Sequence, residues 1–392
     1  MGAPDASAER AGLIVRTAEA EHLAGYGQPA LSDRLPRGWL FPLAVFGVVW
    51  LLTPVAWYGS DAIYGQSHPW IWHFVMKDAA FYRGIAQYGY TGDRAKGAFF
   101  PVFPLLIHLV SYLTGGNYAI AGLITSIACG AAASVAVWAL ADRVRGRRVA
   151  DRAVLLFCAF PGAMTFALLY SEPLGVALSA AALLALLDRR WLLAGIIGAL
   201  ATAERPDLIV LVVVSGVTAV EAIRTRREWR AMLAPALTPL GVLAFFCFLW
   251  YRYHNYAYWF SIEKSDWHQH FDGGIDTFRV LLWLDPRDGH HELFAVMLTI
   301  MFLAALAGIG LMLAARLPLP LQLFAILTIV LIVTSSNGGA KPRFVWTAFP
   351  IFIGAAAKLP RAIYWPVVIL SAAGLFLFIG AWQYIFRGPP AP

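Results

Sequence analysis

Long apolar segments separated by short basic runs dominate this chain of 392 residues. Segments such as 39–58 and 118–141 can cross the hydrocarbon core of a bilayer, which takes about 20 residues of α-helix. The chain is 60% hydrophobic and only 14% charged, and its mean hydropathy is +0.66. Backbone polar groups in lipid must be satisfied within the chain. The sequence therefore predicts an all-α polytopic membrane protein.

The basic runs indicate which ends of the apolar segments face the cytoplasm. Lys and Arg are enriched at cytoplasmic helix ends, and the runs 142–148 (DRVRGRR) and 224–230 (RTRREWR) mark that side. Arg34 and Arg37 precede the first segment, which places the N-terminus in the cytoplasm. The net charge of +7 comes largely from such runs, so it reports topology and predicts no nucleic-acid partner.

Applied along the whole chain, this rule predicts about eleven transmembrane helices. The expected spans are 39–58, 118–141, 153–170, 172–187, 191–203, 208–223, 232–250, 292–315, 321–334, 344–357 and 364–386. They form one integral membrane domain, 38–386, between a disordered cytoplasmic tail, 1–37, and a short extracytoplasmic tail, 387–392. We expect a multi-pass protein of the plasma (inner) membrane.

Two polar loops, 59–117 and 251–290, are expected on the extracytoplasmic side. In the first, apolar residues recur at helical spacing on one stripe: Trp72, Val75, Met76, Ala79, Tyr82, Ile85 and Ala86. This pattern predicts one amphipathic helix that lies in the membrane interface. A Gly/Pro loop and a second interfacial or re-entrant helix within 99–113 should follow it.

Nearly every ionisable residue that topology leaves unexplained falls on the extracytoplasmic face. These residues come from separate loops and are Asp78, Arg83, Glu172, Glu204, Arg205, Asp207, the cluster 263–272, Lys341 and Arg343. Charged groups at membrane depth are costly unless they face a cavity or one another. Their convergence predicts one polar chamber that opens outward.

Four of these residues have a possible catalytic or binding role, and for each of them a purely structural role is the alternative. Asp78 is the strongest candidate for a catalytic carboxylate, although it could form only an ion pair with Lys77. Glu172 is either a second catalytic carboxylate or the cap of the helix that it begins. Arg205 and Arg343 stand beside prolines at helix ends, where a guanidinium could hold a phosphate bidentately or anchor the helix at the interface.

Histidines and tryptophans alternate in the second loop, at His254, Trp259, Trp267, His268 and His270. Aromatic faces pack on the apolar face of a pyranose while polar neighbours bond its hydroxyls, so this loop suits sugar recognition. The HxH spacing of His268 and His270 could ligate a metal, but no residue nearby completes a ligand set. We therefore expect no metal.

Four stretches of the chain resemble motifs of the PIG-V type mannosyltransferases, the bacterial relatives of GPI mannosyltransferase 2 within the GT-C glycosyltransferase superfamily. They are KDAAFYRGIAQYGY (77–90) with FFPVFPLL (99–106), FPGAMTFALLYSEPL (160–174), RRWLLAGIIGALATAERPD (189–207) and KPRFVWTAFPIFIG (341–354). The family usually reads R-W-D-x-x-H/W-Y at the first motif. Here Met76 and Lys77 precede Asp78, so the acid is kept while its neighbours differ.

The resemblance implies a GT-C-like fold, interfacial helices in the first extracytoplasmic loop and polyprenyl-phosphate-mannose as donor. Asp78 would be the general base for an acceptor hydroxyl, with Glu172 as the second catalytic carboxylate. Arg343, Arg205 and Lys341 would bind the donor phosphate. Contacts to sugar or acceptor are expected from Tyr82, Arg83, Trp259, Trp267, His268 and His270. The acceptor would be a glycolipid or glycan, reached without a nucleotide sugar or a metal cofactor.

Two other functions remain open. One is a GT-C transferase of another polyprenyl-linked sugar, such as arabinofuranose or glucose. The other is a polytopic transporter or lipid flippase that uses the same chamber for a polar cargo. The middles of the expected spans are almost purely apolar and offer no ion-coupling group, which favours the enzyme.

Overall fold

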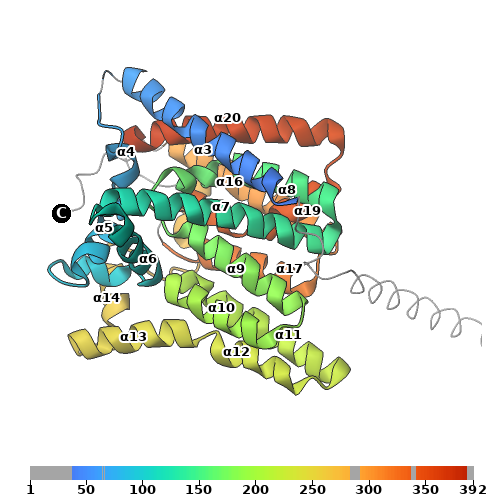
Figure 1. Ribbon diagram of the computed structural model, residues 1–392. Helices are drawn as coiled ribbons and strands as arrows, with labels where there is room; N and C mark the ends of the chain where they lie inside the picture. The colour runs from blue at the N-terminus through green and yellow to red at the C-terminus, as the bar shows by residue number, and fades with distance from the viewer. Residues whose placement is uncertain (1–37, 64, 66, 283–291, 337–340, 386–392) are drawn as a thin grey trace, which may run out of the picture. The chain divides into compact units, whose positions relative to one another are not determined.

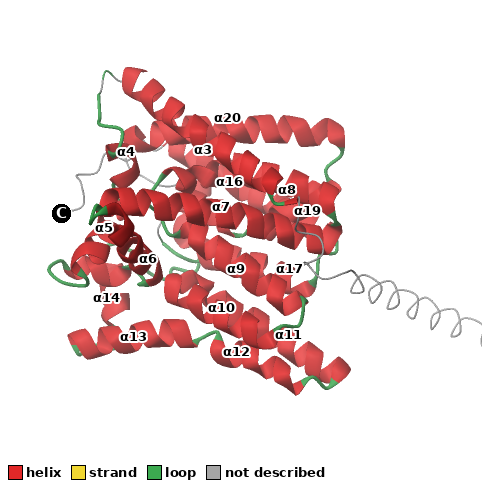
Figure 2. Cartoon of the chain, in the orientation of Figure 1, coloured by secondary structure: helices red, strands yellow, loops and turns green. Residues whose placement is uncertain are grey.

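The computed structural model describes residues 38–63, 65, 67–282, 292–336 and 341–385, and all structural statements here concern these residues. The described part contains no β-strand beyond an isolated bridge between Phe271 and Ser335 (Figure 2). The all-α fold class is therefore confirmed. The expected tails, 1–37 and 387–392, lie outside the described residues. Clustering of the contacts separates residues 1–40 from the rest of the chain, and the described residues after Leu40 belong to one compact unit.

The first helix and the first polar loop account for about the first quarter of the described residues. Their elements are α3 (Leu40–Ile63), α4 (Trp72–Val75), α5 (Asp78–Tyr88), η2 (Arg94–Ala98), α6 (Val102–Ser111) and η3 (Tyr112–Thr114). The short helix expected within 99–113 is confirmed by α6. The placement of α5 and α6 in the membrane interface stays a prediction.

The single amphipathic helix expected from Trp72 to Ala86 is wrong, because the chain breaks into α4 and α5. Met76 is extended, with ψ of 159°, and Lys77 has φ of +56° and ψ of −128°. A positive φ strains a residue that carries a Cβ, and such strain persists only where the surrounding structure imposes it. The break makes Asp78 the first residue of α5, where the helix dipole favours a negative charge.

The longer helices follow the first loop, and their bounds lie close to the expected spans. They are α7 (Tyr118–Arg145), α8 (Arg147–Ala159), η4 (Pro161–Ala167), α9 (Glu172–Leu187), α10 (Trp191–Glu204), η5 (Pro206–Ile209), α11 (Val210–Arg226), η6 (Trp229–Met232), α12 (Leu233–Leu237), α13 (Leu240–Tyr253), α14 (Tyr258–Ser265), α15 (Ile275–Leu281), α16 (Glu292–Ala314), α17 (Leu319–Val333), α18 (Lys341–Thr347), α19 (Pro350–Lys358) and α20 (Arg361–Ile385). In the described part, 5 helices are long and apolar enough to cross a membrane. Several shorter apolar helices accompany them, so the count of eleven spans stays a prediction.

Three of the expected spans are interrupted, which corrects the sequence interpretation. The span 232–250 is divided, since α12 ends at Leu237 and α13 begins at Leu240. Residues 153–170 do not form one helix, because α8 and η4 are bent by 75°. Phe160 is extended before Pro161, and proline has no N–H to continue the helical ladder. The expected span 344–357 is likewise divided, since α18 ends at Thr347 and α19 begins at Pro350.

Close helix contacts hold the apolar bundle together. Figure 1 shows α7, α9 and α10 running alongside one another, and α9 packs against both neighbours. Small residues permit the closest approach: a Cβ added at Gly241 of α13 would lie 1.8 Å from the carbonyl oxygen of Ala199 in α10. Without a hydrophobic driving force in lipid, such tight backbone packing is what holds membrane helices together.

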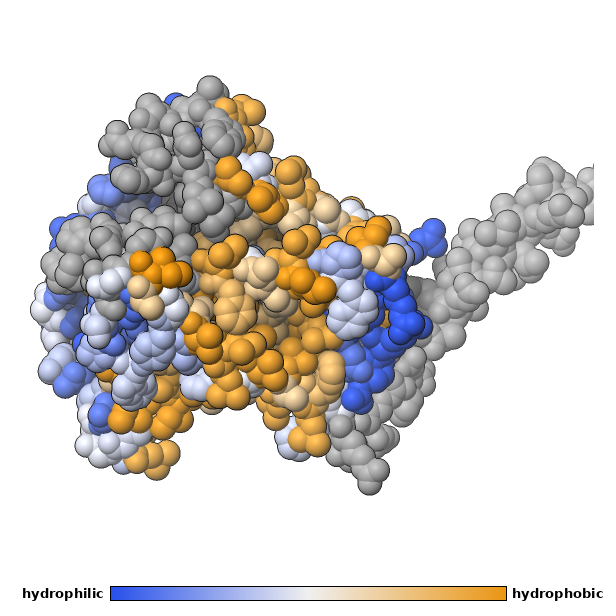
Figure 3. All heavy atoms as spheres, turned by 90° about the horizontal axis from the view of Figure 1, so that it is seen from above, coloured by the Kyte–Doolittle hydropathy of each residue, from blue (hydrophilic) through white to orange (hydrophobic). Residues whose placement is uncertain are grey.

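An apolar band covers the middle of the surface in Figure 3, and hydrophilic residues gather at both ends. Large apolar side chains on α3 and α20 point outward; Leu51 is 65% and Leu370 is 71% exposed. In water such surfaces would be unfavourable, whereas in lipid they are favourable. The protein is therefore a multi-pass membrane protein.

The second polar loop packs on the first. Arg94 of η2 forms an ion pair with Asp266, with 2.8 Å between Nη2 and Oδ1. A Cβ added at Gly97 would lie 2.7 Å from the ring of Tyr258, so η2 and α14 approach closely. Trp267 lies edge-on to the ring of Phe81 in α5. The second loop thus covers the helix that begins with Asp78.

Candidate active site

Asp78 and Arg343 form a direct ion pair, although 265 positions separate them in the sequence. Arg343 Nη1 lies 2.7 Å from Asp78 Oδ2, and the two side chains are only 13% and 19% exposed. Asp78 begins α5 and Arg343 lies in the first turns of α18. The predicted convergence of the first loop with the segment around Arg343 is therefore observed.

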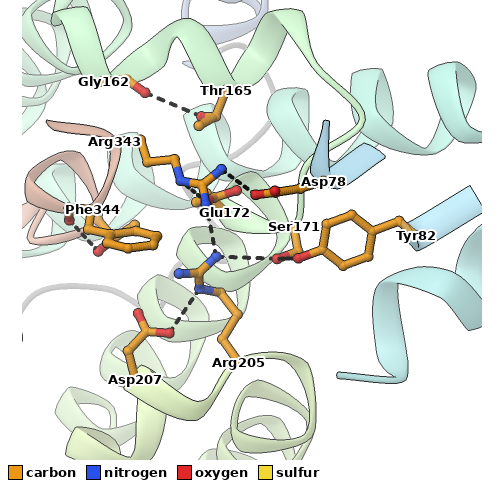
Figure 4. Close-up of polar contacts among 11 residues, drawn as sticks. Asp78, Tyr82, Gly162, Thr165, Ser171, Glu172, Arg205, Asp207, Arg343 and Phe344 are labelled. Carbon is orange, nitrogen blue, oxygen red and sulfur yellow. Dashed lines mark hydrogen bonds and ion pairs between the residues drawn. The ribbon is translucent and has the colours of Figure 1, made fainter. Parts of the chain in front are cut away.

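Glu172 connects this pair to a second arginine. Its Oε1 atom lies 3.2 Å from Arg343 Nε and 3.3 Å from Arg205 Nη1. Arg205 Nε in turn lies 3.0 Å from Asp207 Oδ1. Figure 4 shows Arg343 between Asp78 and Glu172, with Arg205 and Asp207 beyond. Carboxylates and guanidiniums thus alternate along one chain of five residues, of which Glu172 and Arg205 are buried and the other three are partly buried.

Local backbone structure explains how Glu172 and Arg205 come to this place. Glu172 is the first residue of α9, followed by Pro173, and both an acid and a proline are favoured in the first turn. Arg205 follows α10 in an extended conformation, with φ of −150°, because Pro206 excludes the helical conformation before it. Ser171, and not Glu172, is the N-cap residue of α9, and no side chain forms a cap hydrogen bond there, so the capping alternative for Glu172 is wrong. Glu172 acts on this helix end only through its charge.

Aromatic rings and a serine surround the two guanidiniums. Arg343 Cζ lies 4.8 Å from the ring centre of Tyr170 and 4.9 Å from that of Phe344. The side chain of Tyr82 donates a hydrogen bond of 2.7 Å to Ser171 Oγ. Planar guanidiniums stack well on aromatic faces, which orients them without removing their N–H donors.

Lys77 and Glu263 add two groups with shifted pKa values. Burial lowers the pKa of the Lys77 ammonium to about 8; Asp78 opposes this shift and Arg343 adds to it. Burial raises the pKa of the Glu263 carboxyl to about 8, and the charge of Asp78 acts in the same direction. Groups whose surroundings shift their pKa values are frequent at functional sites. Glu263 was expected within the cluster 263–272, whereas Lys77 was expected only as a possible partner of Asp78.

Three further residues that were predicted for the site are Arg83, Trp259 and Lys341. Arg83 lines a shallow hollow of about 430 Å³ together with Gln87 and Tyr118. Trp259 Nε1 donates a hydrogen bond of 3.3 Å to the carbonyl oxygen of Ala98, so its side chain contacts the first polar loop. The side chain of Lys341 lies outside the described residues.

The histidine and tryptophan loop is partly structural. Trp267 lies edge-on to the rings of Phe81 and Phe99, and its indole N–H has no hydrogen-bond partner among the described residues. His268 is exposed, and His270 Nδ1 lies 3.2 Å from Ser336 Oγ. The contacts found in the described part do not join either histidine to the charged chain. Their role toward sugar or acceptor stays a prediction.

Several residues of the site were not expected from the sequence. Tyr170 and Ser171 precede Glu172 in the motif YSE, and Phe344 follows Arg343. Apolar and hydroxyl residues are common at the ends of membrane helices, so their type alone carries no signal. Their position directly beside an expected site residue is the signal that could have found them.

The geometry can be compared with known proteins. Residues 96–251 match the family model of dolichyl-phosphate-mannose-protein mannosyltransferases. No curated protein sequence matches the chain significantly. The crystal structure of ArnT from Cupriavidus metallidurans bound to undecaprenyl phosphate is similar, with a TM-score of 0.53 and 16% identity over 89% of this chain and 72% of that chain. The apo ArnT structure gives a TM-score of 0.54 and 15% identity over 87% and 75%.

These likenesses define the class of fold. The chain has a GT-C-type fold similar to that of ArnT, which confirms the expected fold class. The matched segment includes Glu172 and Arg205, and it ends before Arg343. The narrower resemblance to the PIG-V type stays a prediction.

Proposed function

We propose that this protein transfers mannose from polyprenyl-phosphate-mannose to an extracytoplasmic lipid-linked or glycan acceptor, with inversion at the anomeric carbon. One observation carries the proposal: Arg205 and Arg343 converge on a single carboxylate oxygen of Glu172, and Arg343 also holds Asp78. This arrangement combines an anion-binding site and a potential base within the reach of one guanidinium.

The paired arginines suit the phosphodiester of a lipid-linked sugar. A guanidinium presents a planar fork of N–H donors that matches the non-bridging oxygens of a phosphate. Here carboxylates use these donors, so a bound phosphate would compete with them for Arg343 and Arg205. Competition for Arg343 would release Asp78 from its ion pair at the moment when the donor is in place.

The reaction then follows from residue types. The acceptor oxygen attacks the anomeric carbon of mannose, the bond between that carbon and the phosphate oxygen breaks, and polyprenyl phosphate leaves. Asp78 takes the proton of the acceptor hydroxyl, since a hydroxyl is a poor nucleophile at neutral pH. The two arginines stabilise the charge that develops on the leaving phosphate. Glu172 positions both guanidiniums, and no metal is needed for these steps.

Topology supports an extracytoplasmic site. The basic residues Arg143 and Arg145 lie in the last turn of α7. The first polar loop leads into the other end of this 28-residue helix, about 42 Å away at 1.5 Å per residue. Because basic residues mark the cytoplasmic side, the loop that begins α5 would face outward.

Similar proteins support both the polyprenyl phosphate carrier and the mannose of the proposed donor, by different observations. The similar ArnT structure contains undecaprenyl phosphate, which supports a polyprenyl phosphate as the lipid carrier. Support for mannose comes from the description of the matched family model and from the PIG-V resemblance. The similar structure contains a lipid phosphate and no named sugar, so transfer of another polyprenyl-linked sugar is the second candidate.

A reconstituted transfer assay tests the proposal. Purified protein in liposomes is given polyprenyl phosphate carrying labelled mannose, glucose or arabinofuranose, together with membrane glycolipids as acceptors. We expect labelled glycolipid and free polyprenyl phosphate from the mannose donor. Arg343→Gln should lose this activity, and Arg94→Gln, which removes an exposed arginine of the first loop, should keep it.

Each other result has a defined meaning. Transfer from glucose or arabinofuranose alone would replace mannose by that sugar. The absence of product from all three donors, with the protein folded, would contradict the enzyme and favour a transporter of lipid-linked cargo.

A further inference from the structure

A second cluster of polar side chains lies at the end of α3, apart from the charged chain described above. Asp61 is in the last turn of α3, His68 is in the loop that follows, and His73 is in α4. One ligand atom from each residue lies within 4.8 Å of the other two. Nothing in the sequence singles out these residues, because their spacing matches no common ligand motif.

The distances within this cluster fit a bound cation. Asp61 Oδ1 lies 3.2 Å from His68 Nδ1, and Asp61 Oδ2 lies 3.2 Å from His73 Nε2. Donor atoms around a tetrahedral ion with bonds of about 2.0–2.1 Å lie roughly 3.3 Å apart. Small rotations of the carboxylate would therefore bring the three residues onto one ion.

Burial and charge give a second, independent reason. The side chains of Asp61 and His73 are 5% and 0% exposed, so a carboxylate and an imidazole are held away from water. Asp61 also lies at the C-terminal end of a 24-residue helix, where the helix dipole disfavours a negative charge and favours a cation. A divalent ion bound by the carboxylate and both imidazoles would also lie at a helix end that favours positive charge.

Ring packing fixes both imidazoles in place. His73 stacks on Trp57, with ring centres 5.1 Å apart and an angle of 14° between the planes. His68 stacks on Trp72 at 3.9 Å and 8°. Ligands whose orientation is fixed by their surroundings bind a metal with less loss of conformational entropy. His68 is 24% exposed, which leaves a route for an ion and for a water ligand.

We propose that Asp61, His68 and His73 form a binding site for a divalent transition-metal ion, with Zn²⁺ as the ion that this ligand set suits best. The ion fastens the end of α3 to α4. The carbonyl oxygen of Phe74 accepts a hydrogen bond of 3.1 Å from Leu169 N, so α4 is also tied to the segment that leads to Glu172. The site thus has a structural role, and it does not depend on the proposed sugar transfer.

Metal analysis of the purified full-length protein tests this proposal without any activity assay. The protein carries an affinity tag without histidine and is incubated with ZnCl₂. Unbound zinc is removed in metal-free buffer, and the zinc that remains is measured by inductively coupled plasma mass spectrometry. Wild type should retain about one Zn²⁺ per chain, and Asp61→Asn and His68→Gln should retain less than about a tenth of that amount. X-ray absorption at the zinc edge should show nitrogen and oxygen ligands that include two imidazoles.

The exposed pair His268 and His270 provides the matched control. The double variant H268A/H270A should keep the ion, since neither residue belongs to the cluster. Loss of zinc from this double variant, with retention in Asp61→Asn and His68→Gln, would overturn the assignment. Wild type that takes up no zinc would overturn it too, and the cluster would then be a carboxylate hydrogen-bonded to two histidines. If Asp61→Asn does not fold, the zinc content of His68→Gln decides, because His68 is partly exposed and its substitution disturbs the packing less.

Discussion

The ion pair between Asp78 and Arg343 gives a quantitative prediction about stability. Unit charges about 4 Å apart at an effective dielectric constant of about 20 attract by about 4 kcal/mol. Removing both groups from water offsets much of this attraction. Because the side chains are only 19% and 13% exposed, solvent screening is weak, and we expect a net coupling free energy of about 1–3 kcal/mol.

A double-mutant cycle measures this coupling. Arg343→Gln leaves the carboxylates of Asp78 and Glu172 without their shared cation, so it should lower the free energy of unfolding by about 3–5 kcal/mol. In the double variant D78N/R343Q a neutral amide replaces the carboxylate of Asp78. The free energy of unfolding should therefore fall by less than the sum of the losses in the two single variants. Unfolding of all four proteins in mixed micelles, at increasing fractions of denaturing detergent, supplies the values.

The exposed pair of Arg94 and Asp266 is the control cycle. Its atoms lie at a similar distance, 2.8 Å, but Arg94 is 60% exposed, so solvent should screen the pair and no coupling should be measurable. If the effects of the substitutions at Asp78 and Arg343 simply add, the two residues do not interact in the folded protein. The candidate site would then lose its central contact.

Three further predictions follow from packing and burial. Gly241→Ala places a Cβ 1.8 Å from a backbone carbonyl oxygen of α10 and should cost about 1–3 kcal/mol or more in unfolding assays, whereas Gly216→Ala meets nothing within 4 Å and should cost nothing. Gly175→Ala brings a Cβ to 2.8 Å from Cδ of Arg205, and displacing this guanidinium should slow sugar transfer by up to about 10²-fold while the protein stays folded. Burial lowers the pKa of Lys77 to about 8, so between about pH 8 and 10.5 the unfolded chain holds a proton that the folded protein has lost. Wild-type stability should therefore rise with pH through this window, by at most about 1.4 kcal/mol per unit, and the rise should be absent in Lys77→Met.

Helix positions followed well from the sequence where local chemistry determines them. The expected span 172–187 coincides with α9, because Glu172 and a proline begin the helix and a charged turn ends it. The sequence also indicated that Asp78, Glu172, Arg205 and Arg343 would converge, since ionisable groups at membrane depth need partners. Their pairing, with Glu172 between the two arginines, required the structure.

Features imposed by tertiary contacts could not be found in this way. Neither glycine nor proline marks the break at Lys77, whose positive φ is held by the surrounding fold. The expected spans also ran through Pro161 and Pro350, where the missing N–H interrupts the helix. Asp61 was overlooked because its histidine partners lie at irregular spacings on other elements.

The transfer rate of Asp78→Asn tests the proposed reaction most directly. Labelled polyprenyl-phosphate-mannose is incubated with excess wild type, Asp78→Asn or Asp266→Asn, and the labelled glycolipid is followed over a single turnover. The account predicts a loss of about 10²–10⁴-fold for Asp78→Asn, because a neutral amide cannot take the proton of the acceptor, and a normal rate for Asp266→Asn. A near-normal rate in Asp78→Asn would contradict the assignment of the base, and Glu172 would then be the residue to test.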